Sequence, residues 1–508
     1  MRVCLRLALL LFAAVIRADV IPAPLFTDGA VLQRDKPLPV WGRADAGEKV
    51  AVSFRGETVH ATAGPDGRWI VFLQAAPASA EGTVLTLSGK NLVTLRDIVV
   101  GDVWLASGQS NMEWPVSRAA NAEQEIASAR YPLLRQIRIE RTVGEAPADL
   151  VKTTGWQPST PATVGAFSAV AYFFARELHQ KLGIPFGIIN SSWGGTPVEA
   201  WMSPAALASD PRFAVVQERW QKVLADFPAA NAAFDRRLAD WTQAEAAAKA
   251  GNAAVHADWI RKNPRPRPPR GPADPWSPAG LFNGMINPLL PCALRGTIWY
   301  QGENNVDRAA EYHALFSAMI TTWRAHFAQG DFPFYWVNLA NFNAPGDPTG
   351  VAYAFLREAQ TKTLALPNTG QALAIDIGHA DDIHPTNKQD VGRRLALLAK
   401  RRVYDLVVDD TGPTFASITR EGTALRVRFT NAETGLIARD KPVQSLEVAG
   451  ADKVFRPALG KIDRDMLIVS SPQVKQPVAV RYAWRNAPEA NLYNGAGLPA
   501  VPFRSDDW

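Results

Sequence analysis

The middle of the chain is organised around one segment, VWLASGQSNM at residues 103–112. Residues 103–106 form a short apolar run, and a polar turn that contains Gly108 and Ser110 follows directly. A short apolar run bounded by turn residues is typical of a strand buried on both faces of a sheet. The segment therefore predicts a buried strand, with Ser110 on a tight turn that exposes its hydroxyl. From these residues alone, a glycine-serine turn that only caps a helix is the alternative.

Strands and helices alternate through the rest of this region. Buried strands are predicted at 186–190, 297–300, 334–339 and 372–377, and helices at 167–182, 312–327, 354–366 and 387–402. Such alternation predicts a parallel sheet with helices on both faces. Ligands bind beyond the carboxyl ends of the strands in sheets of this kind. We therefore expect an α/β domain over 96–405 with its functional site at one edge of the sheet.

Both flanks of this region predict β structure. Short alternating runs separated by turn residues occupy 19–95, and short runs of the same kind return in 406–508. We expect a β-sandwich domain at each end. A helical stretch followed by NPRPRPPR at 263–270 interrupts the α/β pattern, and we interpret about 205–295 as an insertion. The proline run is interpreted as a stiff surface loop, with a partner-binding segment as the alternative.

Composition and charge exclude several classes of protein. Of the 508 residues, 47% are hydrophobic and 20% are charged, which excludes a disordered chain. The formal charge of +5 includes Arg2, Arg6 and Arg17, and the small remainder predicts no nucleic-acid partner.

Residues 1–18 combine these arginines with an apolar stretch too short to span a bilayer, and end at Ala18. This pattern predicts a signal peptide and an exported mature chain, periplasmic or extracellular, without a membrane span.

A serine nucleophile needs a base, and the chain holds seven histidines. His379 and His384 follow the strand predicted at 372–377, and Asp381 and Asp382 lie between them. An aspartate on the same loop as a histidine can hydrogen-bond to it and stabilise its protonated form. His384 is therefore the candidate base, with a helix start flanked by acids as the alternative interpretation of this segment.

Two further polar segments follow predicted strands, NSSWGGT at 190–196 and WYQGENN at 299–305. The paired glycines of the first let a backbone N–H approach a ligand closely. Gln301 and Asn304 of the second carry amides that can donate to an oxyanion. Each segment alone is compatible with an ordinary loop. Because every one of these polar loops follows a predicted parallel strand, a single fold would place them at one edge.

Together the motifs resemble the sialate O-acetylesterase family of carbohydrate esterases. The resemblance is carried by GDVW at 101–104, SGQSNMEW at 107–114, SWGGTPVEAW at 192–201, WYQGEN at 299–304 and DIHP at 382–385. In the wider SGNH (GDSL-like) hydrolases, too, the catalytic serine comes early in the chain and the Asp and His come late. The resemblance covers 96–405, reaches the N-terminal region through VLQR at 31–34 and PVWG at 39–42, and is loose at the C-terminus. It implies an SGNH-type, flavodoxin-like parallel sheet.

The resemblance implies a serine esterase that removes O-acetyl groups from a carbohydrate through an acetyl-serine intermediate. It makes Ser110 the nucleophile and His384 the general base. Asp381 is the expected orienting acid, because SGNH enzymes generally place the acid there. Asp382 and a backbone carbonyl are the alternatives. No cofactor and no metal is implied.

The resemblance also implies an oxyanion hole. The Ser110 N–H, a glycine N–H and the Gln301 amide would form it, with Gly195 preferred over Gly194. Glu303 and Asn304 are secondary candidates for the site. Asn305 stands where the wider superfamily has the aspartate of Gly-x-Asn-Asp.

The substrate is left open between O-acetylated sialic acid and an acetylated polysaccharide such as xylan. Most of the 16 tryptophans are expected in the cores, although indole faces also suit sugar rings. A glycoside hydrolase that uses Glu303 with Asp381 or Asp382 is one alternative function. A non-catalytic carbohydrate-binding protein is another, because β-sandwiches and tryptophans suit that role.

Overall fold

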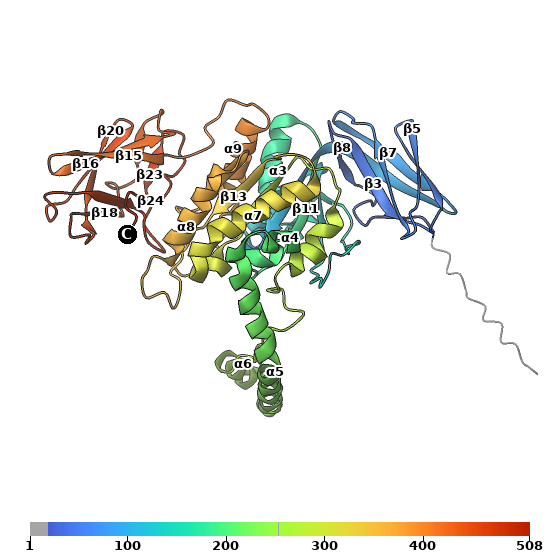
Figure 1. Ribbon diagram of the computed structural model, residues 1–508, viewed down its shortest axis with the longest axis horizontal. Helices are drawn as coiled ribbons and strands as arrows, with labels where there is room; N and C mark the ends of the chain where they lie inside the picture. Colours follow the sequence, from blue (N-terminus) through green and yellow to red (C-terminus); the bar gives the residue numbers. More distant parts are fainter. Residues whose placement is uncertain (1–18, 252) are drawn as a thin grey trace, which may run out of the picture.

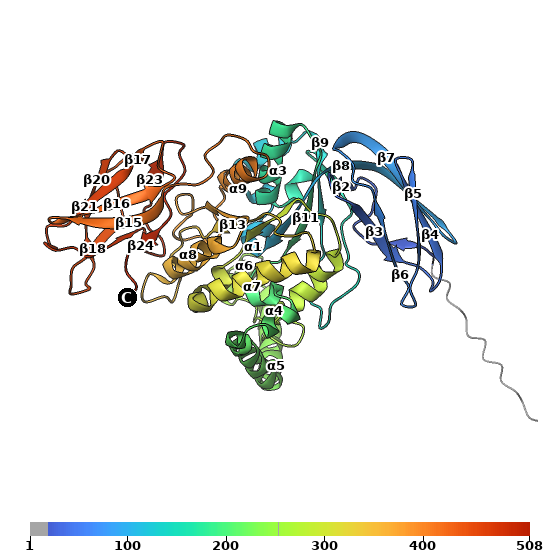
Figure 2. The same ribbon diagram turned by 45° about the horizontal axis from the view of Figure 1, so that its top comes forward.

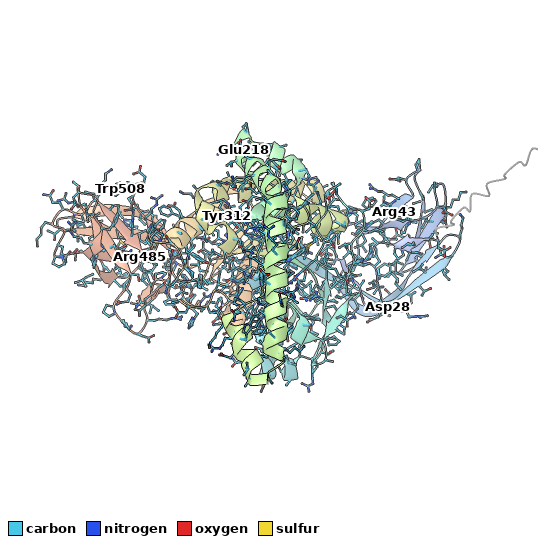
Figure 3. The ribbon with its side chains drawn as sticks, turned by 90° about the horizontal axis from the view of Figure 1, so that it is seen from below. Asp28, Arg43, Glu218, Tyr312, Arg485 and Trp508 are labelled. Carbon is cyan, nitrogen blue, oxygen red and sulfur yellow. The ribbon has the colours of Figure 1, made fainter. Side chains whose placement is uncertain are left out.

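The computed structural model describes residues 19–251 and 253–508. A central α/β region lies between N-terminal strands, blue in Figure 1, and C-terminal strands, red in Figure 1. Figure 3 shows Asp28 and Arg43 at one end of the molecule and Arg485 and Trp508 at the other. The signal peptide predicted at 1–18 lies outside the described residues. Within the part of the chain that is described, no helix is long and apolar enough to cross a membrane.

The N-terminal strands pair antiparallel, except for β2, which pairs in parallel, and they surround a core that continues into the α/β region. One sheet has the order β1-β3-β6, and β4, β5 and β7 lead into the central sheet. Every second residue of β6 is buried, which places one face of the strand on the core. The bounds are β1 (Ile21–Pro22), β2 (Val31–Gln33), β3 (Leu38–Arg43), β4 (Lys49–Phe54), β5 (Glu57–Thr62), β6 (Arg68–Leu73) and β7 (Ser79–Ser88).

One long strand, β8 (Leu92–Gly108), joins the N-terminal ladders to the central sheet. Its first part pairs antiparallel with β7, and its second part pairs in parallel with its neighbours in the central sheet. The short strand predicted at 103–106 is therefore the end of a longer strand that begins in the N-terminal region. Asp102 sits inside it because Arg34 and Arg295 contact its buried carboxylate, with Nε–Oδ1 distances of 3.0 and 2.8 Å.

The central sheet has the order β10-β9-β11-β8-β12-β13-β14. Neighbours from β9 to β14 pair in parallel and only β10 pairs antiparallel, so the predicted α/β core with a parallel sheet is confirmed. The bounds are β9 (Tyr131–Arg138), β10 (Gln157–Ser159), β11 (Phe186–Ser192), β12 (Gly296–Tyr300), β13 (Phe334–Asn338) and β14 (Thr369–Leu373). β9 and β11 lie on one side of β8, and β12, β13 and β14 lie on the other. The order of the strands therefore reverses at β8, which favours a ligand site there.

Helices cover both faces of the sheet. Figure 2 shows α3 (Ala169–Leu182) and α9 (Lys388–Arg402) on one side, and α7 (Ala309–Phe327) and α8 (Ala352–Lys362) on the other. α3 packs closely on α9 because Gly392 has no side chain. A Cβ at Gly392 would lie 2.6 Å from the Cβ of Phe173.

The helical insertion projects from the central region (Figure 1). It contains α4 (Pro204–Ala208), the long helix α5 (Ala214–Lys249) and α6 (Ala253–Lys262). The proline-rich run 263–270 that follows is not helical. It passes beside α5, where a Cβ at Gly271 would lie 2.4 Å from the Phe227 ring. From there the chain returns to the central sheet as β12, between β8 and β13.

The C-terminal region surrounds a second core, to which Leu373 and Ile375 of the central region also contribute. It has two main antiparallel sheets, so the β structure expected at this end is confirmed. One has the order β15-β16-β21-β20 and the other β19-β18-β22-β24. Arg357 of α8 joins this region to the centre, because its guanidinium donates to the backbone oxygens of Leu339, Arg485 and Asn486. The bounds are β15 (Thr414–Glu421), β16 (Ala424–Thr430), β18 (Leu446–Ala449), β19 (Arg456–Pro457), β20 (Leu459–Asp463), β21 (Met466–Ser470), β22 (Ala479–Tyr482) and β24 (Phe503–Arg504), with β17 (Leu436–Ala438) and β23 (Leu492–Asn494) as a separate pair.

Candidate active site

Ser110 begins the short helix α1 (Ser110–Glu113) directly after β8. The turn requires a glycine at position 108. Gly108 has a φ of 131°, and a Cβ there would lie 2.2 Å from the backbone oxygen of Tyr300. Among the described residues the backbone N–H of Ser110 donates to no protein acceptor, as is usual for the first residue of a helix. The turn thus presents a partly exposed hydroxyl beside a free N–H.

His384 lies against this serine. Its Nε2 is 2.8 Å from Ser110 Oγ, although the two residues are 274 positions apart in the sequence. The imidazole stacks on Trp114, with ring centroids 4.8 Å apart and an angle of 19° between the ring planes. Burial, and after it the positive charge of Lys388, lower the pKa of His384 below its ordinary value. A neutral imidazole at this distance can remove the proton from the Ser110 hydroxyl.

The acid beside His384 is Asp382 and not the expected Asp381. Asp382 Oδ1 accepts the backbone N–H of His384 at 2.8 Å and lies 3.9 Å from the imidazole Nδ1. This turn directs Asp382 back onto its own loop toward the imidazole. The carboxylate of Asp381 is exposed and makes no hydrogen bond or ion pair with any described residue, and its backbone N–H donates to His379.

Replacing Asp382 with asparagine is expected to lower kcat by about 3- to 10-fold. The effect is modest because the Asp382 side chain is 56% exposed and its contact with Nδ1 is long. Because the Asp382 charge raises the pKa of His384, its loss should move the acid limb of the kcat/KM profile to lower pH. Asp381→Asn is the matched control and should keep wild-type kinetics. The assignment is wrong if Asp381→Asn has the larger effect.

The paired glycines lie next to Ser110. A Cβ at Gly194 would lie 3.1 Å from the Cβ of Ser110. The N–H of Gly194 already donates to Glu113 Oε2 at 2.9 Å. Gly195 has a φ of 78°, and its N–H has no hydrogen-bond acceptor in the described part of the chain. The geometry therefore favours Gly195, the preferred of the two candidates, as the second backbone donor.

Gln301, the expected side-chain donor, is committed to other contacts. Its side chain is completely buried. Its Nε2 donates to Asn305 Oδ1 at 2.7 Å and to the backbone oxygen of Thr196 at 3.1 Å. Both N–H bonds are thus used, and Tyr312 donates to its Oε1 at 2.9 Å. Gln301 supports the loop but has no free N–H for an oxyanion. Its role as an oxyanion donor therefore stays a prediction, which this geometry does not favour.

Asn304 is the side-chain amide that remains available. It is partly exposed, and its amide makes no hydrogen bond with any other described residue. Gln109 fixes the turn around it, because its Oε1 accepts the N–H groups of Gly302 and Asn304 at 3.3 and 3.4 Å. Asn304 also occupies the asparagine position of the superfamily's Gly-x-Asn-Asp pattern. It replaces Gln301 as the candidate side-chain donor.

The chain is similar to proteins of known activity. Residues 275–400 match the family described as "Carbohydrate esterase, sialic acid-specific acetylesterase". A sialate O-acetylesterase of Rattus norvegicus is 31% identical to the chain over 524 residues, which span 93% of this chain and 92% of the relative. The chain belongs to the sialate O-acetylesterase family.

Two further proteins are similar to this chain over most of its length. The Homo sapiens sialate O-acetylesterase is 28% identical over 95% of this chain and 91% of its own length. A crystal structure of a carbohydrate acetylesterase from Xanthomonas citri is 40% identical, with a TM-score of 0.80, and covers 96% of this chain and 100% of that chain. The expectation that this chain is a carbohydrate esterase is therefore confirmed.

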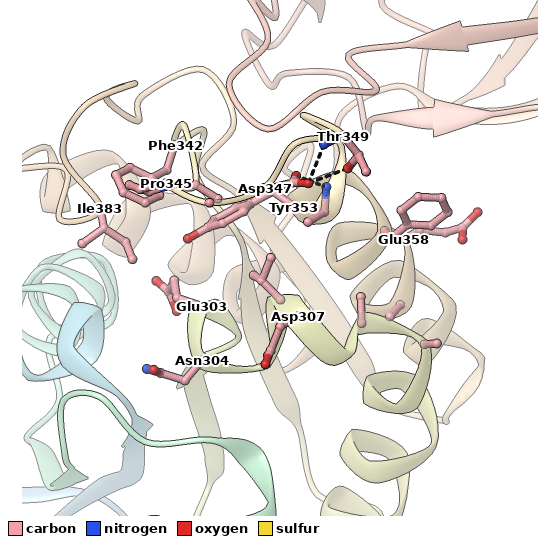
Figure 4. Close-up of a pocket in the computed structure, with 18 of the residues that line it drawn as sticks. Glu303, Asn304, Asp307, Phe342, Pro345, Asp347, Thr349, Tyr353, Glu358 and Ile383 are labelled. Atoms are coloured by element: carbon pink, nitrogen blue, oxygen red, sulfur yellow. Dashed lines mark hydrogen bonds between the residues drawn. The ribbon is translucent and has the colours of Figure 1, made fainter. Parts of the chain in front are cut away.

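A groove of about 920 Å³ opens beside the site of this family member. Figure 4 shows Glu303, Asn304 and Ile383 near one end of it and Glu358 toward the other. Trp276 from the chain after α6 also lines the groove and donates its indole N–H to the Gly195 oxygen at 2.6 Å. The insertion thus contacts the glycine turn of the active site.

Sequence reasoning missed several side chains that shape this esterase site. Glu113 and Trp114 stood inside a quoted motif but received no role, although one holds Gly194 and the other stacks on His384. Asn111 stood there too, and Lys388 carried no signal beyond its place shortly after His384. Within residues 19–251 and 253–508 there is no cluster of three or more metal-ligating side chains.

Proposed function

We propose that the chain is an exported serine esterase that removes O-acetyl groups from carbohydrates through an acetyl-serine intermediate. One observation carries the proposal: Ser110 Oγ lies 2.8 Å from His384 Nε2. The N–H groups of Ser110 and Gly195 and the amide of Asn304, which have no acceptor in the described chain, support it. The parallel sheet and the order of the site residues also support an SGNH-type catalytic domain.

The reaction proceeds in two steps. His384 takes the proton from Ser110 as the oxygen attacks the acetyl carbonyl, and the N–H donors stabilise the negative charge on the carbonyl oxygen. The sugar hydroxyl then leaves with the proton from the imidazolium, and the acetyl group stays on Ser110. Water, activated by the same histidine, attacks the acetyl-enzyme and releases acetate.

Two substrate classes are compatible with the site, O-acetylated sialic acid and an acetylated polysaccharide such as xylan. The groove is large enough for sugar units beyond the acetylated one. Acetate release from these substrates should be compared with hydrolysis of an aryl acetate and an aryl glycoside. We expect acetate release and no cleavage of the aryl glycoside. Glycoside cleavage would favour paired carboxylates, and sugar binding without any turnover would favour a binding protein.

Export is part of the proposal because residues 1–18 have the composition of a signal peptide. Expression of the full chain in a bacterial host should give a mature protein that begins after Ala18. A chain that keeps residues 1–18 and stays in the cytosolic fraction would contradict export.

Phe342→Ala is expected to raise KM for an acetylated oligosaccharide by about 5- to 10-fold. Phe342 lines the groove and packs on Tyr353, with ring centroids 5.9 Å apart. Hydrolysis of a small aryl acetate should stay unchanged, because that substrate does not fill the groove. Phe72→Ala, which removes an exposed ring of β6, is the matched control. Equal loss on both substrates would contradict a role of the groove in sugar binding.

A further inference from the structure

Polar side chains from different elements meet behind the Ser110–His384 pair. Asn111 of α1 is 1% exposed and Lys388 of α9 is 0% exposed. Glu303, at the start of the 3-10 helix η7 (Glu303–Arg308), turns its carboxylate toward them. Its Oε2 is shielded from solvent and has no hydrogen-bond partner in the described part of the chain. The reaction steps above use none of these groups.

Asn111 connects the other members of this cluster. Its Oδ1 accepts from Lys388 Nζ at 2.5 Å, and its Nδ2 donates to Glu303 Oε1 at 2.6 Å and to the Ile383 oxygen at 3.0 Å. An ammonium group only donates, so it fixes which end of the amide faces Lys388. The amide is therefore held in one orientation with every N–H used.

The residues that Asn111 joins, and Asn111 itself, are next in the sequence to residues with a proposed role in the reaction. Asn111 follows Ser110, Ile383 precedes His384 and Glu303 precedes Asn304. We propose that Lys388, Asn111 and Glu303 form a buried clamp that holds the nucleophile, base and oxyanion loops together and places a positive charge behind His384. This inference rests on the proposed esterase function and names positioning residues for it.

The position of Lys388 explains the electrostatic part of the proposal. Lys388 Nζ lies 5.7 Å from the centroid of the Trp114 ring that stacks on His384, and 5.4 Å from that of Tyr300. Arg118 and Lys388 oppose the protonation of His384, whereas Asp382 on its own loop favours it. Glu303 faces Lys388 through Asn111 and raises the pKa of that ammonium, which burial lowers to about 7.

The sign of the effect follows from these charges. A positive charge near His384 disfavours the imidazolium, so it keeps the histidine in its basic form to lower pH. Below pH 7, where the acid limb of an imidazole base falls, Lys388 itself is mostly protonated. Removal of the charge should therefore raise the pKa of His384 and move the acid limb to higher pH.

Kinetic profiles of Lys388→Met and Lys388→Gln test the clamp. We expect the acid limb of kcat/KM for an aryl acetate to move up by about half a pH unit or more in both variants. We expect kcat to fall about 10-fold or more with KM nearly unchanged, because the catalytic geometry and not substrate binding is affected. Lys388→Arg keeps the charge and should restore the position of the limb.

The control is Lys400→Met on the same helix. Lys400 is 13% exposed and pairs with Glu177 at 2.8 Å, away from the site. This variant should lose stability but keep the wild-type profile. If Lys388→Met does not fold, Lys388→Gln retains a donor for Asn111 and carries the test.

An unchanged acid limb in the charge-removing variants, or the same shift in Lys400→Met, would overturn the clamp. A wild type that releases no acetate would instead overturn the proposed function. The two failures are therefore separable, because only the second abolishes activity in the unmodified protein.

Discussion

Ser110→Ala is expected to lower the rate of acetate release by at least about 10⁴-fold. The alanine has no oxygen to attack the acetyl carbonyl, so the acetyl-enzyme cannot form. Without the serine oxygen, only the stabilisation from the oxyanion donors and from substrate binding remains. Acetate release from an acetylated oligosaccharide and from an aryl acetate should be measured for both proteins.

The loss should not come from unfolding. Ser110 is partly exposed, and the hydrogen bond of its hydroxyl is the one with His384. Ser117→Ala, an exposed serine of the nearby 3-10 helix η1 (Val116–Arg118), is the matched control and should keep wild-type activity. Ser110→Ala with activity close to wild type would exclude Ser110 as the nucleophile.

Asn304→Ala is expected to lower kcat by about 10²- to 10³-fold, or about 3 kcal/mol of barrier. Its amide lies on the polar loop that follows β12 and makes no hydrogen bond within the described chain. An oxyanion forms only during the reaction, so the loss should appear in kcat and leave KM nearly unchanged. Thermal unfolding should change little, because no described side chain depends on the Asn304 amide.

Gln301→Ala gives the informative comparison for Asn304. It should lower the midpoint of thermal unfolding, because it removes the partners of Asn305 and Tyr312 inside the protein. Its effect on kcat should follow the damage to the loop. If Gln301→Ala folds normally and loses as much kcat as expected for Asn304→Ala, while Asn304→Ala stays active, the assignment of the oxyanion donor is reversed.

The sequence predicted the parts of the fold that follow from local patterning. The apolar runs that became β11, β12 and β13 and the periodic runs that became α3, α7 and α9 were all located. β9 was missed because Arg135 and Gln136 interrupt its apolar pattern, although both are buried in the structure. A buried arginine is stabilised by acceptors that are distant in sequence, such as the oxygens of Gly29 and Asp97, which no local pattern reveals.

Prediction of the site from the sequence is limited in the same way. Motif order was sufficient to pair Ser110 with His384, because the carboxyl ends of parallel strands meet at one edge. The choice between Asp381 and Asp382 depends on one turn, and the choice between Gln301 and Asn304 depends on which amide is already bonded. Lys388 has no motif of its own, and its role follows only from its contact with Asn111.

Covalent labelling of the active serine identifies the nucleophile without a sugar substrate. The wild-type protein should be incubated with an aryl phosphonate ester, which reacts with activated serines, and the modified peptide identified by mass spectrometry. We expect the peptide with Ser110 to be labelled, activity to fall in proportion, and His384→Ala not to be labelled. Loss of activity with the label on another residue, or full activity after Ser110 is labelled, would contradict it.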